Sequence, residues 1–334
     1  MTSTATRVPT PKSALRLIST KNLPRQEWLS VRNQGIGSSD AATAAGINPY
    51  QSRLELWMIK TGRDEQLPKV DPDDVNSAVY WGNVLEPIVA QQYSVTTGNK
   101  VRRINAVLQH PDPDKPWMLA NLDYSVVGNE EVQILECKTA GEYGARLWRY
   151  GVPDYVQCQV QHQLAVTGKQ AADVCVLLCG QALKVHRIHR DEEIISKLIE
   201  LERQFWHCVE TDTPPATDGS ESAARALQSL YPHDGGEMVD FREKTEIAEA
   251  FASLLGTQAR LAQLKTEEAQ LKQQIQSAMG EASRALFDQG EVTWKRSKDS
   301  VVPDTKRLQD EHPELVAFYT QTRPGSRRFV INTY

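Results

Sequence analysis

The sequence predicts a mixed α/β fold, in which helices flank a central sheet of parallel and antiparallel strands. Apolar residues alternate with polar ones, or run together, over strand-length segments at residues 101–110, 117–127, 132–139, 172–179 and 184–189. Helical periodicity precedes these segments and separates the third from the fourth. A helix between two strands supplies the crossover that a parallel pair requires, so this order of elements favours a mixed sheet covered by helices.

Turn and capping residues set the ends of the predicted helices. Ser38, Ser39 and Asp40 are good helix-capping residues after a glycine-containing break, and Gly98 is suited to end a helix. Gly128, with the asparagine after it, predicts a tight turn between the second and third strands. The predicted helices cover residues 24–62 with a break at 35–40, 81–97, 155–167, 191–210, 242–280 and 305–320.

Changes in composition divide the chain into four expected parts. Polar residues and prolines gather after residue 211, which favours a domain boundary there. Beyond the long helix we expect a hairpin near Gly290 and a final strand over residues 327–332. The expected parts are a disordered lead-in over residues 1–20, a main domain over 21–212, a linker over 213–236 and a C-terminal extension over 237–334.

The bulk composition narrows the possible functions. The net charge is −5, so a protein that holds nucleic acid with this composition needs a local basic surface. The five cysteines include no Cys-x-x-Cys pair, which disfavours a zinc or iron–sulfur site and favours reduced thiols in the cytoplasm. No apolar run reaches the ~18 residues of a membrane-spanning helix, so we expect no membrane partner.

Two carboxylates and a lysine form the clearest candidate site. Glu136 and Lys138 lie two residues apart on a predicted strand, so their side chains share a face. Pairing with the preceding strand would bring Asp123 beside Glu136, where two carboxylates repel unless a cation lies between them. Their oxygens suit Mg²⁺, with Mn²⁺ as a substitute, and the backbone carbonyl of Cys137 can supply a further ligand. The same short pattern also occurs as an exposed ion pair on a strand.

Two predicted helices add polar side chains to this set. Glu86 lies on the helix before the strands and can serve as a further ligand of a metal or of its water. Gln159 lies on the helix after them and can orient that water or a phosphate. A divalent metal polarises a phosphoryl oxygen and activates water, and a neighbouring lysine stabilises the charge that develops. The set points to metal-dependent hydrolysis of a phosphodiester, with an exposed polar face as the alternative for Gln159.

Five blocks of sequence occur in the order found in a known nuclease family. The blocks are Gln34–Asp40, Trp81–Glu86, Asp123, Leu135–Lys138 and Gln159–Gly168. Together they resemble the YqaJ-like viral recombinase family, the bacteriophage lambda exonuclease branch of the PD-(D/E)XK nucleases. The resemblance covers about residues 25–207 and implies the restriction-endonuclease-like core of that superfamily.

The resemblance assigns roles to the residues of the candidate site. It implies that Asp123, Glu136 and Glu86 lie at the metals. It implies that Lys138 is the catalytic lysine and that Gln159 is the motif glutamine of the following helix. The implied activity is a 5′ to 3′ exonuclease that resects double-stranded DNA ends for recombination by single-strand annealing.

The resemblance also implies a second site and a set of partners. Arg32, with Ser38 or Ser39, matches an anchor for the terminal phosphate of the DNA. An arginine fork and hydroxyls at a helix N-terminus suit such a phosphate. By analogy, a single-strand annealing recombinase and a ring-forming homo-oligomer are possible partners, and a phage or prophage protein would act in the cytoplasm of its bacterial host.

Several alternatives stay open at the level of sequence. A metal-dependent endonuclease can use the same carboxylates, and a non-catalytic DNA-binding scaffold can retain the same fold. A nuclease with an iron–sulfur cluster needs four clustered cysteines, including one near the N-terminus, whereas the first cysteine here is Cys137. The long helix over residues 242–280 can be an arm for oligomerisation or for a partner, or a brace against its own chain.

Overall fold

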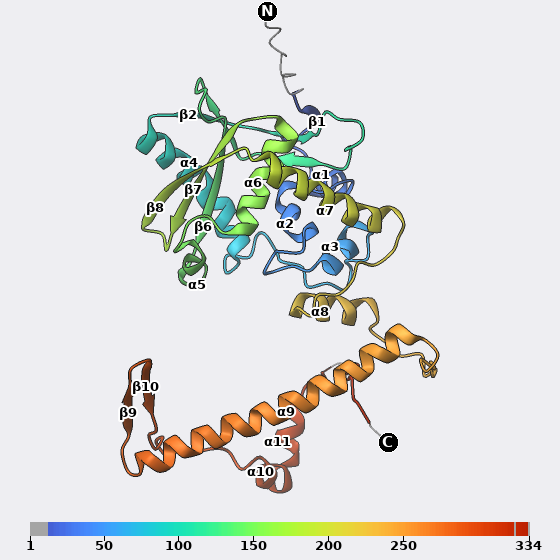
Figure 1. Cartoon of the computed structure of the whole chain (residues 1–334), viewed down its shortest axis with the longest axis vertical. Helices are drawn as coiled ribbons and strands as arrows, with labels where there is room; N and C mark the ends of the chain where they lie inside the picture. Colours follow the sequence, from blue (N-terminus) through green and yellow to red (C-terminus); the bar gives the residue numbers. More distant parts are fainter. Residues whose placement is uncertain (1–12, 324, 333–334) are drawn as a thin grey trace, which may run out of the picture. The chain divides into compact units, whose positions relative to one another are not determined.

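The chain divides into two units, Met1–Pro232 and His233–Tyr334. A five-stranded mixed sheet forms the centre of the first unit (Figure 1). The computed structural model describes residues 13–323 and 325–332. The strand order is β2-β5-β6-β7-β8, in which only β6 and β7 run parallel. The sheet confirms the predicted mixed α/β fold. Its strands are β2 (Lys100–Arg103), β5 (Tyr124–Val127), β6 (Ile134–Ala140), β7 (Ala171–Leu178) and β8 (Ala182–His189).

Helices cover both faces of this sheet. Helix α4 packs its buried Val89 and Tyr93 on one face, and α6 packs on the other face through Val160 and Leu164. Because both faces are covered, seven of the eight residues of β7 are fully buried, as in a parallel sheet core. The helices of this unit are α1 (Arg25–Asn33), α2 (Ala41–Ala44), α3 (Arg53–Lys60), α4 (Ala78–Thr97), α5 (Glu142–Ala145), α6 (Asp154–Thr167), α7 (Glu192–Glu210) and α8 (Glu221–Leu230), with short 3-10 helices η1 (Ser38–Asp40) and η2 (Arg146–Trp148).

Local signals explain where helix α4 begins and ends. The hydroxyl of Ser77 accepts a hydrogen bond from the N–H of Tyr80, so the helix starts three residues before the predicted position. At its other end Gly98 adopts a positive φ of 74°, which confirms the predicted glycine cap. This helix positions Glu86 beside the sheet.

The strands predicted over residues 101–110 and 117–127 each divide in two. Their first and second halves belong to different sheets, because the chain bends between β2 and β3 and again between β4 and β5. Asp123 lies in the second bend, and its carbonyl accepts a hydrogen bond from Ile104 in the first. The second sheet has the order β1-β3-β4, with strands β1 (Leu15–Ser19), β3 (Ala106–Gln109) and β4 (Leu119–Asn121).

Two segments that were expected to lack structure contain regular elements. Strand β1 lies within the lead-in of residues 1–20 and pairs antiparallel with β3, so the expected disorder is wrong there, whereas residues 1–12 lie outside the described residues. Helix α8 lies within the expected linker of residues 213–236 and packs on α3. Its Ser222 accepts a hydrogen bond from the N–H of Ser52 at 2.8 Å and donates one to Glu55 at 2.6 Å. This part of the linker is therefore fixed to the first unit.

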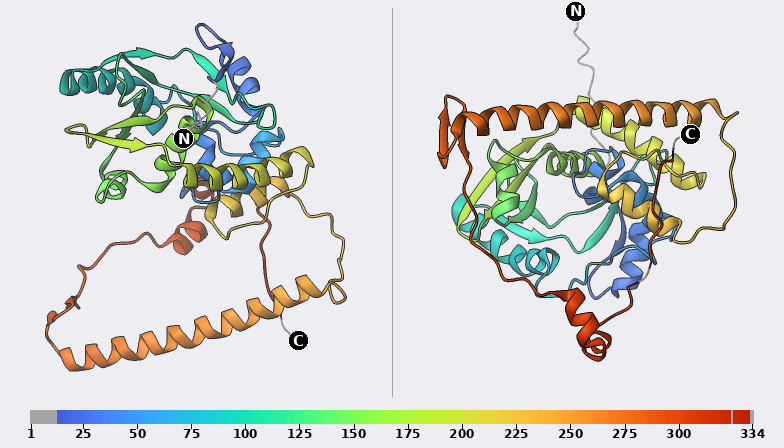
Figure 2. Two further views of the ribbon diagram at one scale, coloured as in Figure 1. Left: turned by 45° about the horizontal axis from the view of Figure 1, so that its top comes forward. Right: turned by 90° about the horizontal axis from the view of Figure 1, so that it is seen from below.

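The second unit is built on one long helix, drawn in orange in Figure 2. The prediction of one helix over residues 305–320 is wrong, because Pro313 lacks an N–H and divides it into two. The strand expected over residues 327–332 is absent from that described stretch. The elements of this unit are α9 (Thr245–Met279), β9 (Arg284–Phe287), β10 (Gly290–Thr293), α10 (Thr305–Glu311) and α11 (Pro313–Phe318).

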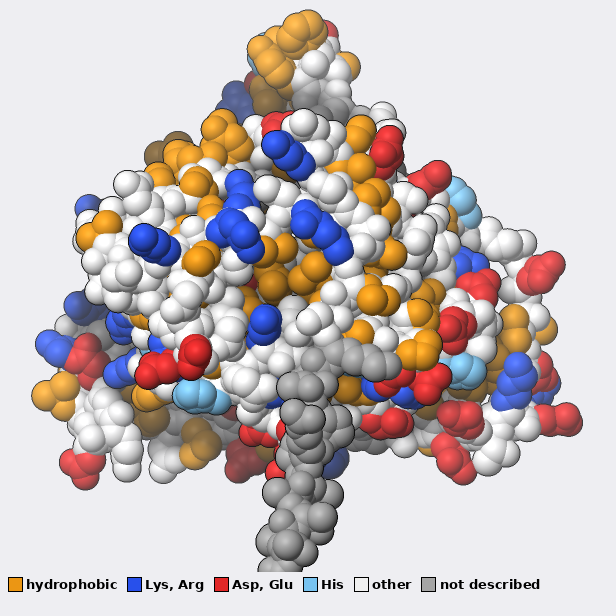
Figure 3. All heavy atoms as spheres, turned by 90° about the horizontal axis from the view of Figure 1, so that it is seen from above, with side chains coloured by type: hydrophobic (Ala, Val, Ile, Leu, Met, Phe, Trp, Pro, Cys, Tyr) orange, Lys and Arg blue, Asp and Glu red, His pale blue; other side chains and the backbone are white. Residues whose placement is uncertain are grey.

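The surface carries a local concentration of basic side chains although the net charge is −5. Figure 3 shows Lys and Arg side chains gathered over an apolar area on one face of the molecule. Strand β2 contributes three exposed basic residues to the surface of the first unit, Lys100, Arg102 and Arg103. Among the described residues, no helix is both long enough and apolar enough to cross a membrane.

Candidate active site

The candidate catalytic side chains surround a small polar cavity beside the start of β5. Its volume is about 240 Å³. Helix α4, the bend before β5 and strand β6 each contribute to it, so the structure brings Glu86, Asp123, Glu136 and Lys138 together as the sequence predicted. The lining residues are Gly82, Asn83, Glu86, Asp123, Glu136, Cys137, Lys138 and Thr139.

Glu136 is buried and held by three donors. Lys138 Nζ lies 2.7 Å from its Oε1, and the amide of Gln159 donates to the same oxygen. The amide of Gln163 donates to Oε2 at 2.7 Å. A carboxylate oxygen has two acceptor positions, so Oε2 keeps one that these contacts do not use. The carboxylate of Glu136 is thus held in one orientation, and one of its oxygens can still bind a cation.

Asp123 lies in the bend between β4 and β5, immediately before Tyr124, the first residue of β5 that pairs with β6. Its Oδ2 accepts a hydrogen bond from the N–H of Cys137 at 2.9 Å. Burial and the negative charge of Glu136 raise the pKa of Asp123 well above its ordinary value, although Lys138 acts in the opposite direction. Two carboxylates in this arrangement repel, and a cation bound between them would let both ionise.

Lys138 is a hydrogen-bond donor rather than a base at neutral pH. Burial alone would lower the pKa of its ammonium, but the charges of Glu136 and Asp123 raise that pKa above its ordinary value. Its Nζ also donates to Oε1 of Gln159 at 2.9 Å. Gln159 therefore bridges Lys138 and Glu136 and fixes both side chains. A lysine held in this way can orient a water or stabilise a negative charge.

Glu86 reaches the cavity from α4 but is already paired. Its Oε1 lies 2.6 Å from the guanidinium of Arg103 on β2. Burial raises the pKa of Glu86, an effect that the nearby Arg103 opposes. Pro87 has no N–H, so the carbonyl of Asn83 lacks its usual helical donor beside the same cavity. Glu86 must leave Arg103, or act through water, to serve as the ligand that the sequence predicted.

The oxygens of this cavity fit a hard divalent cation. Among the described residues, no three acidic, histidine or cysteine side chains converge closely enough to hold a metal by themselves. Mg²⁺ needs fewer, because it commonly binds one or two carboxylates and keeps several waters. Asp123 and Glu136 supply the carboxylates. The N–H of Cys137 points to Asp123, and in a strand the carbonyl of the same residue lies on that side too, so it offers a third oxygen.

The predicted phosphate anchor forms a separate charged cluster. Arg32 Nη2 donates to Ser39 Oγ and to Asp40 Oδ1, each at 2.6 Å, and Lys60 Nζ lies 2.7 Å from Asp40 Oδ2. Burial alone would raise the pKa of Asp40, but Arg32 and Lys60 hold it well below its ordinary value. The cluster has two cations and one anion, so a net positive charge is left for a phosphate.

The helix-capping prediction for this segment holds in position, because Asp40 is the N-cap residue of α2, but its side chain caps the preceding turn instead by accepting a hydrogen bond from the N–H of Gly37 at 3.2 Å. Ser38, Ser39 and Asp40 form η1 themselves, and no side-chain cap bond is made at the start of α2. Ser38 is 3% exposed, and within the described residues its hydroxyl has no hydrogen-bond partner. Ser39 is exposed, so of the two serines it is the one open to a ligand.

Three contributors to these clusters were not selected from the sequence. Gln163 lies four residues after Gln159 on one face of α6, a spacing that could have revealed it. Arg103 and Lys60 carried no such signal, because each meets its carboxylate only through the tertiary fold, 17 and 20 residues away in the chain. Helix α6 carries Gln159 and Gln163 of the cavity and also packs against η1, which carries Ser39 and Asp40 of the other cluster, so one helix connects the two.

Solved exonuclease structures show a distant likeness to this chain. An alkaline exonuclease from Laribacter hongkongensis has 21% identity and a TM-score of 0.45, over 62% of this chain and 100% of that chain. A phage-related exonuclease from Haemophilus somnus 129PT has 12% identity and a TM-score of 0.38, over 55% of this chain and 99% of that chain. Likenesses this distant assign no activity to this chain.

Sequence comparison gives a closer relationship. The protein YqaJ of Bacillus subtilis (strain 168), itself uncharacterised, is 33% identical over 311 residues, which cover 92% of this chain and 94% of that protein. The family model of the YqaJ-like viral recombinase domain matches residues 27–170, which include both charged clusters. The chain therefore belongs to the YqaJ-like viral recombinase family.

Proposed function

We propose that this chain is a Mg²⁺-dependent nuclease that degrades double-stranded DNA from its ends. The observation that carries the proposal is the convergence of Asp123, Glu136 and Lys138 in one polar cavity. Paired carboxylates with an adjacent lysine suit hydrolysis of a phosphodiester, in which negative charge develops on the phosphate. Membership of a viral recombinase family supports DNA as the substrate.

In this proposal Asp123, Glu136 and the carbonyl of Cys137 hold the metal, with Mn²⁺ as an effective substitute. The bound ion supplies a polarised phosphoryl oxygen and a water of lowered pKa. Glu86 completes the metal surroundings after it releases Arg103, or through a bridging water. The hard-oxygen composition of the cavity is the support for Mg²⁺ rather than zinc.

Lys138 and Gln159 prepare the phosphate and the water for reaction. Because its pKa is raised, Lys138 stays protonated at neutral pH and stabilises charge on the phosphate or orients the water. Gln159 restrains Lys138 through the bond at 2.9 Å and restrains Glu136 through its amide. Gln163 adds a second restraint to Glu136. A buried network of this kind holds reacting groups in place without reorganisation at the moment of reaction.

The end-resecting activity and its 5′ to 3′ polarity are inferred from family membership. Arg32 and Ser39 then bind the 5′-terminal phosphate through a guanidinium and a hydroxyl, with the buried Lys60 adding positive charge. The products would be single strands for a single-strand annealing recombinase.

Incubation with matched DNA substrates tests the proposal. The protein with Mg²⁺ should release nucleotides from linear duplex DNA and leave covalently closed circles intact, since the circles offer no end. Linear DNA with 5′-phosphate ends should be degraded faster than DNA with 5′-hydroxyl ends, and Arg32→Ala should remove that preference. Cutting of intact circles would replace the exonuclease proposal with an endonuclease. Absence of cleavage of any substrate would favour a DNA-binding scaffold.

A further inference from the structure

Helix α9 exposes apolar side chains along its middle. It has 35 residues, which corresponds to about 52 Å at 1.5 Å per residue. Leu261, Leu264 and Leu271 are 51%, 58% and 55% exposed. Among the described residues of this helix only Met279 is fully buried. A soluble helix with such a stripe normally buries it against another element, so the middle of α9 is a candidate interaction surface.

The stripe repeats with a period of seven residues. One row consists of Ile247, Leu254, Leu261, Glu268 and Ile275, and a second row of Ala250, Thr257, Leu264, Leu271 and Ala278. A seven-residue repeat that continues over five successive positions in each row is typical of a coiled coil. A helix within a globular core has a broader apolar face with a period of 3.6 residues. Each row has one polar member, which is Glu268 in the first row and Thr257 in the second.

We propose that α9 pairs with α9 of a second copy of this chain, as an antiparallel coiled coil centred between Leu261 and Leu264. In this register Leu261 faces Leu264 of the second copy, and Leu254 faces its Leu271. Thr257 faces Glu268 of the second copy, so the polar members of the two rows share a layer. A parallel dimer would place Glu268 against Glu268 of the second copy, and two like charges in one core layer are unfavourable.

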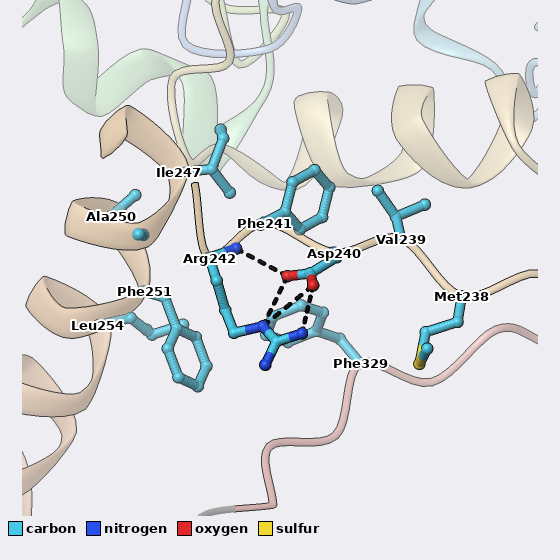
Figure 4. Close-up of a pocket in the computed structure, with 11 residues that line it drawn as sticks. Met238, Val239, Asp240, Phe241, Arg242, Ile247, Ala250, Phe251, Leu254 and Phe329 are labelled. Atoms are coloured by element: carbon cyan, nitrogen blue, oxygen red, sulfur yellow. Dashed lines mark hydrogen bonds and ion pairs between the residues drawn. The ribbon is translucent and has the colours of Figure 1, made fainter. Parts of the chain in front are cut away.

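The hollows at the two ends of α9 fit the same register. An apolar hollow of about 790 Å³ lies at the start of the helix and is shown in Figure 4, where Phe241, Phe251 and Phe329 surround it. A second hollow of about 360 Å³ lies at the other end and includes Ile275 and Ala278. Antiparallel pairing lays the end of one helix over the start of the other, so each hollow receives side chains of the second copy.

The sizes of the core residues agree with this overlap. In the same register Ile247 faces Ala278 of the second copy, and Ala250 faces its Ile275. A large side chain therefore meets a small one in both terminal layers, which lets the layers interdigitate. A parallel dimer would pair alanine with alanine at both ends and leave space between the helices.

Charges beside the core favour the antiparallel orientation. Arg260 and Glu267 are exposed and flank the central layers. Antiparallel pairing puts Arg260 beside Glu267 of the second copy, and the twofold symmetry makes this contact twice. Parallel pairing would put Arg260 beside Lys265 of the second copy, which is a repulsive contact. Charged residues at these flanking positions select the partner and its orientation in coiled coils.

Sedimentation of the full chain at micromolar concentration tests the interface. The wild-type assembly should contain twice as many copies of the chain as the assembly formed by the variant Leu264→Glu. This substitution puts charges into the central layers of the coiled coil, so it should raise the dissociation constant at least about tenfold. Gln263→Glu adds the same charge one residue away, off the stripe, and should sediment as wild type. A wild-type chain with no more copies than Leu264→Glu would overturn the proposal. So would unchanged copy number with a lower unfolding temperature in Leu264→Glu, because that result means the stripe packs on its own chain.

Charge reversal tests the orientation. Arg260→Glu and Glu267→Arg should each weaken the association, and the double variant should restore it, because the contact then forms with reversed signs. In a parallel dimer Arg260→Glu would instead strengthen the association through Lys265. Strengthening by Arg260→Glu, or failure of the double variant to recover affinity, would overturn the antiparallel register.

Discussion

Replacement of Asp40 by asparagine tests how the proposed phosphate anchor is held. The side chain of Lys60 is 1% exposed, and its ammonium lies 2.7 Å from Asp40 Oδ2. The same ammonium also donates a hydrogen bond to the backbone carbonyl of Arg32 at 3.1 Å. Asp40→Asn therefore leaves a buried ammonium without its counter-ion, a change that usually costs about 3–5 kcal/mol. Because the Arg32 side chain is 28% exposed and asparagine keeps one accepting oxygen, we expect the lower end, about 3 kcal/mol.

Urea unfolding followed by tryptophan fluorescence measures this loss. The signal reports on the first unit, since all but one of the seven tryptophans precede residue 233. The pKa of Asp40 lies below its ordinary value, so its contribution to stability is present above about pH 4 and is lost as the pH falls further. The difference between wild type and variant should therefore shrink in that acidic range.

A matched double variant separates the orphaned charge from other effects of the substitution. Asp40→Asn combined with Lys60→Met removes the ammonium together with its partner, so it should be more stable than Asp40→Asn alone. The single variant could lose less than about 1 kcal/mol of unfolding free energy at pH 7, or the double variant could be no more stable than the single one. Either result would refute the Asp40–Lys60 pair as the buried ion pair that holds the anchor around Arg32.

Three further predictions concern the fold and the cavity. Gly35→Ala should lower the free energy of unfolding by at least about 2 kcal/mol, measured by thermal unfolding. The reason is that an added Cβ would lie 2.4 Å from the carbonyl oxygen of Trp117 and 2.8 Å from Leu119 Cγ, and an unchanged melting temperature would contradict this contact. Lys138→Met should lower kcat for DNA cleavage about 10²–10⁴-fold with an unchanged circular dichroism spectrum, and a loss of less than about tenfold would remove Lys138 from the mechanism. Mg²⁺ affinity measured by calorimetry should increase as the pH rises above about 4, the ordinary pKa of an aspartate, because the raised pKa of Asp123 makes protons compete with the metal. An affinity independent of pH would refute that competition.

Much of the cavity could be predicted because its geometry is local. Glu136 and Lys138 lie on one face of β6 by the two-residue period of a strand, and a short hairpin sets Asp123 beside them. The approach of Gln159 follows in turn from the helix that crosses between β6 and β7. Such relations depend on spacing along the chain, which a single sequence displays directly.

The parts that escaped prediction depend on tertiary structure. The residues on either side of Asp123 form one continuous strand pattern, and only the packing of β1, β3 and β4 into a second sheet breaks it. The pairing of Glu86 with Arg103 depends on how α4 lies against β2, which the spacing of residues along the chain does not determine. Lys60 resembles an ordinary helix-end lysine until the fold buries it beside Asp40.

The most direct test of the central claim compares wild type with Glu136→Gln on linear duplex DNA. The structure predicts that wild type releases nucleotides with Mg²⁺ and none with a chelator, because the paired carboxylates act through the metal. Glu136→Gln should cleave at least about 10³-fold more slowly while fluorescence anisotropy shows that it still binds the DNA. Cleavage by wild type in chelator, or wild-type cleavage by Glu136→Gln, would contradict a metal centre built on Asp123 and Glu136.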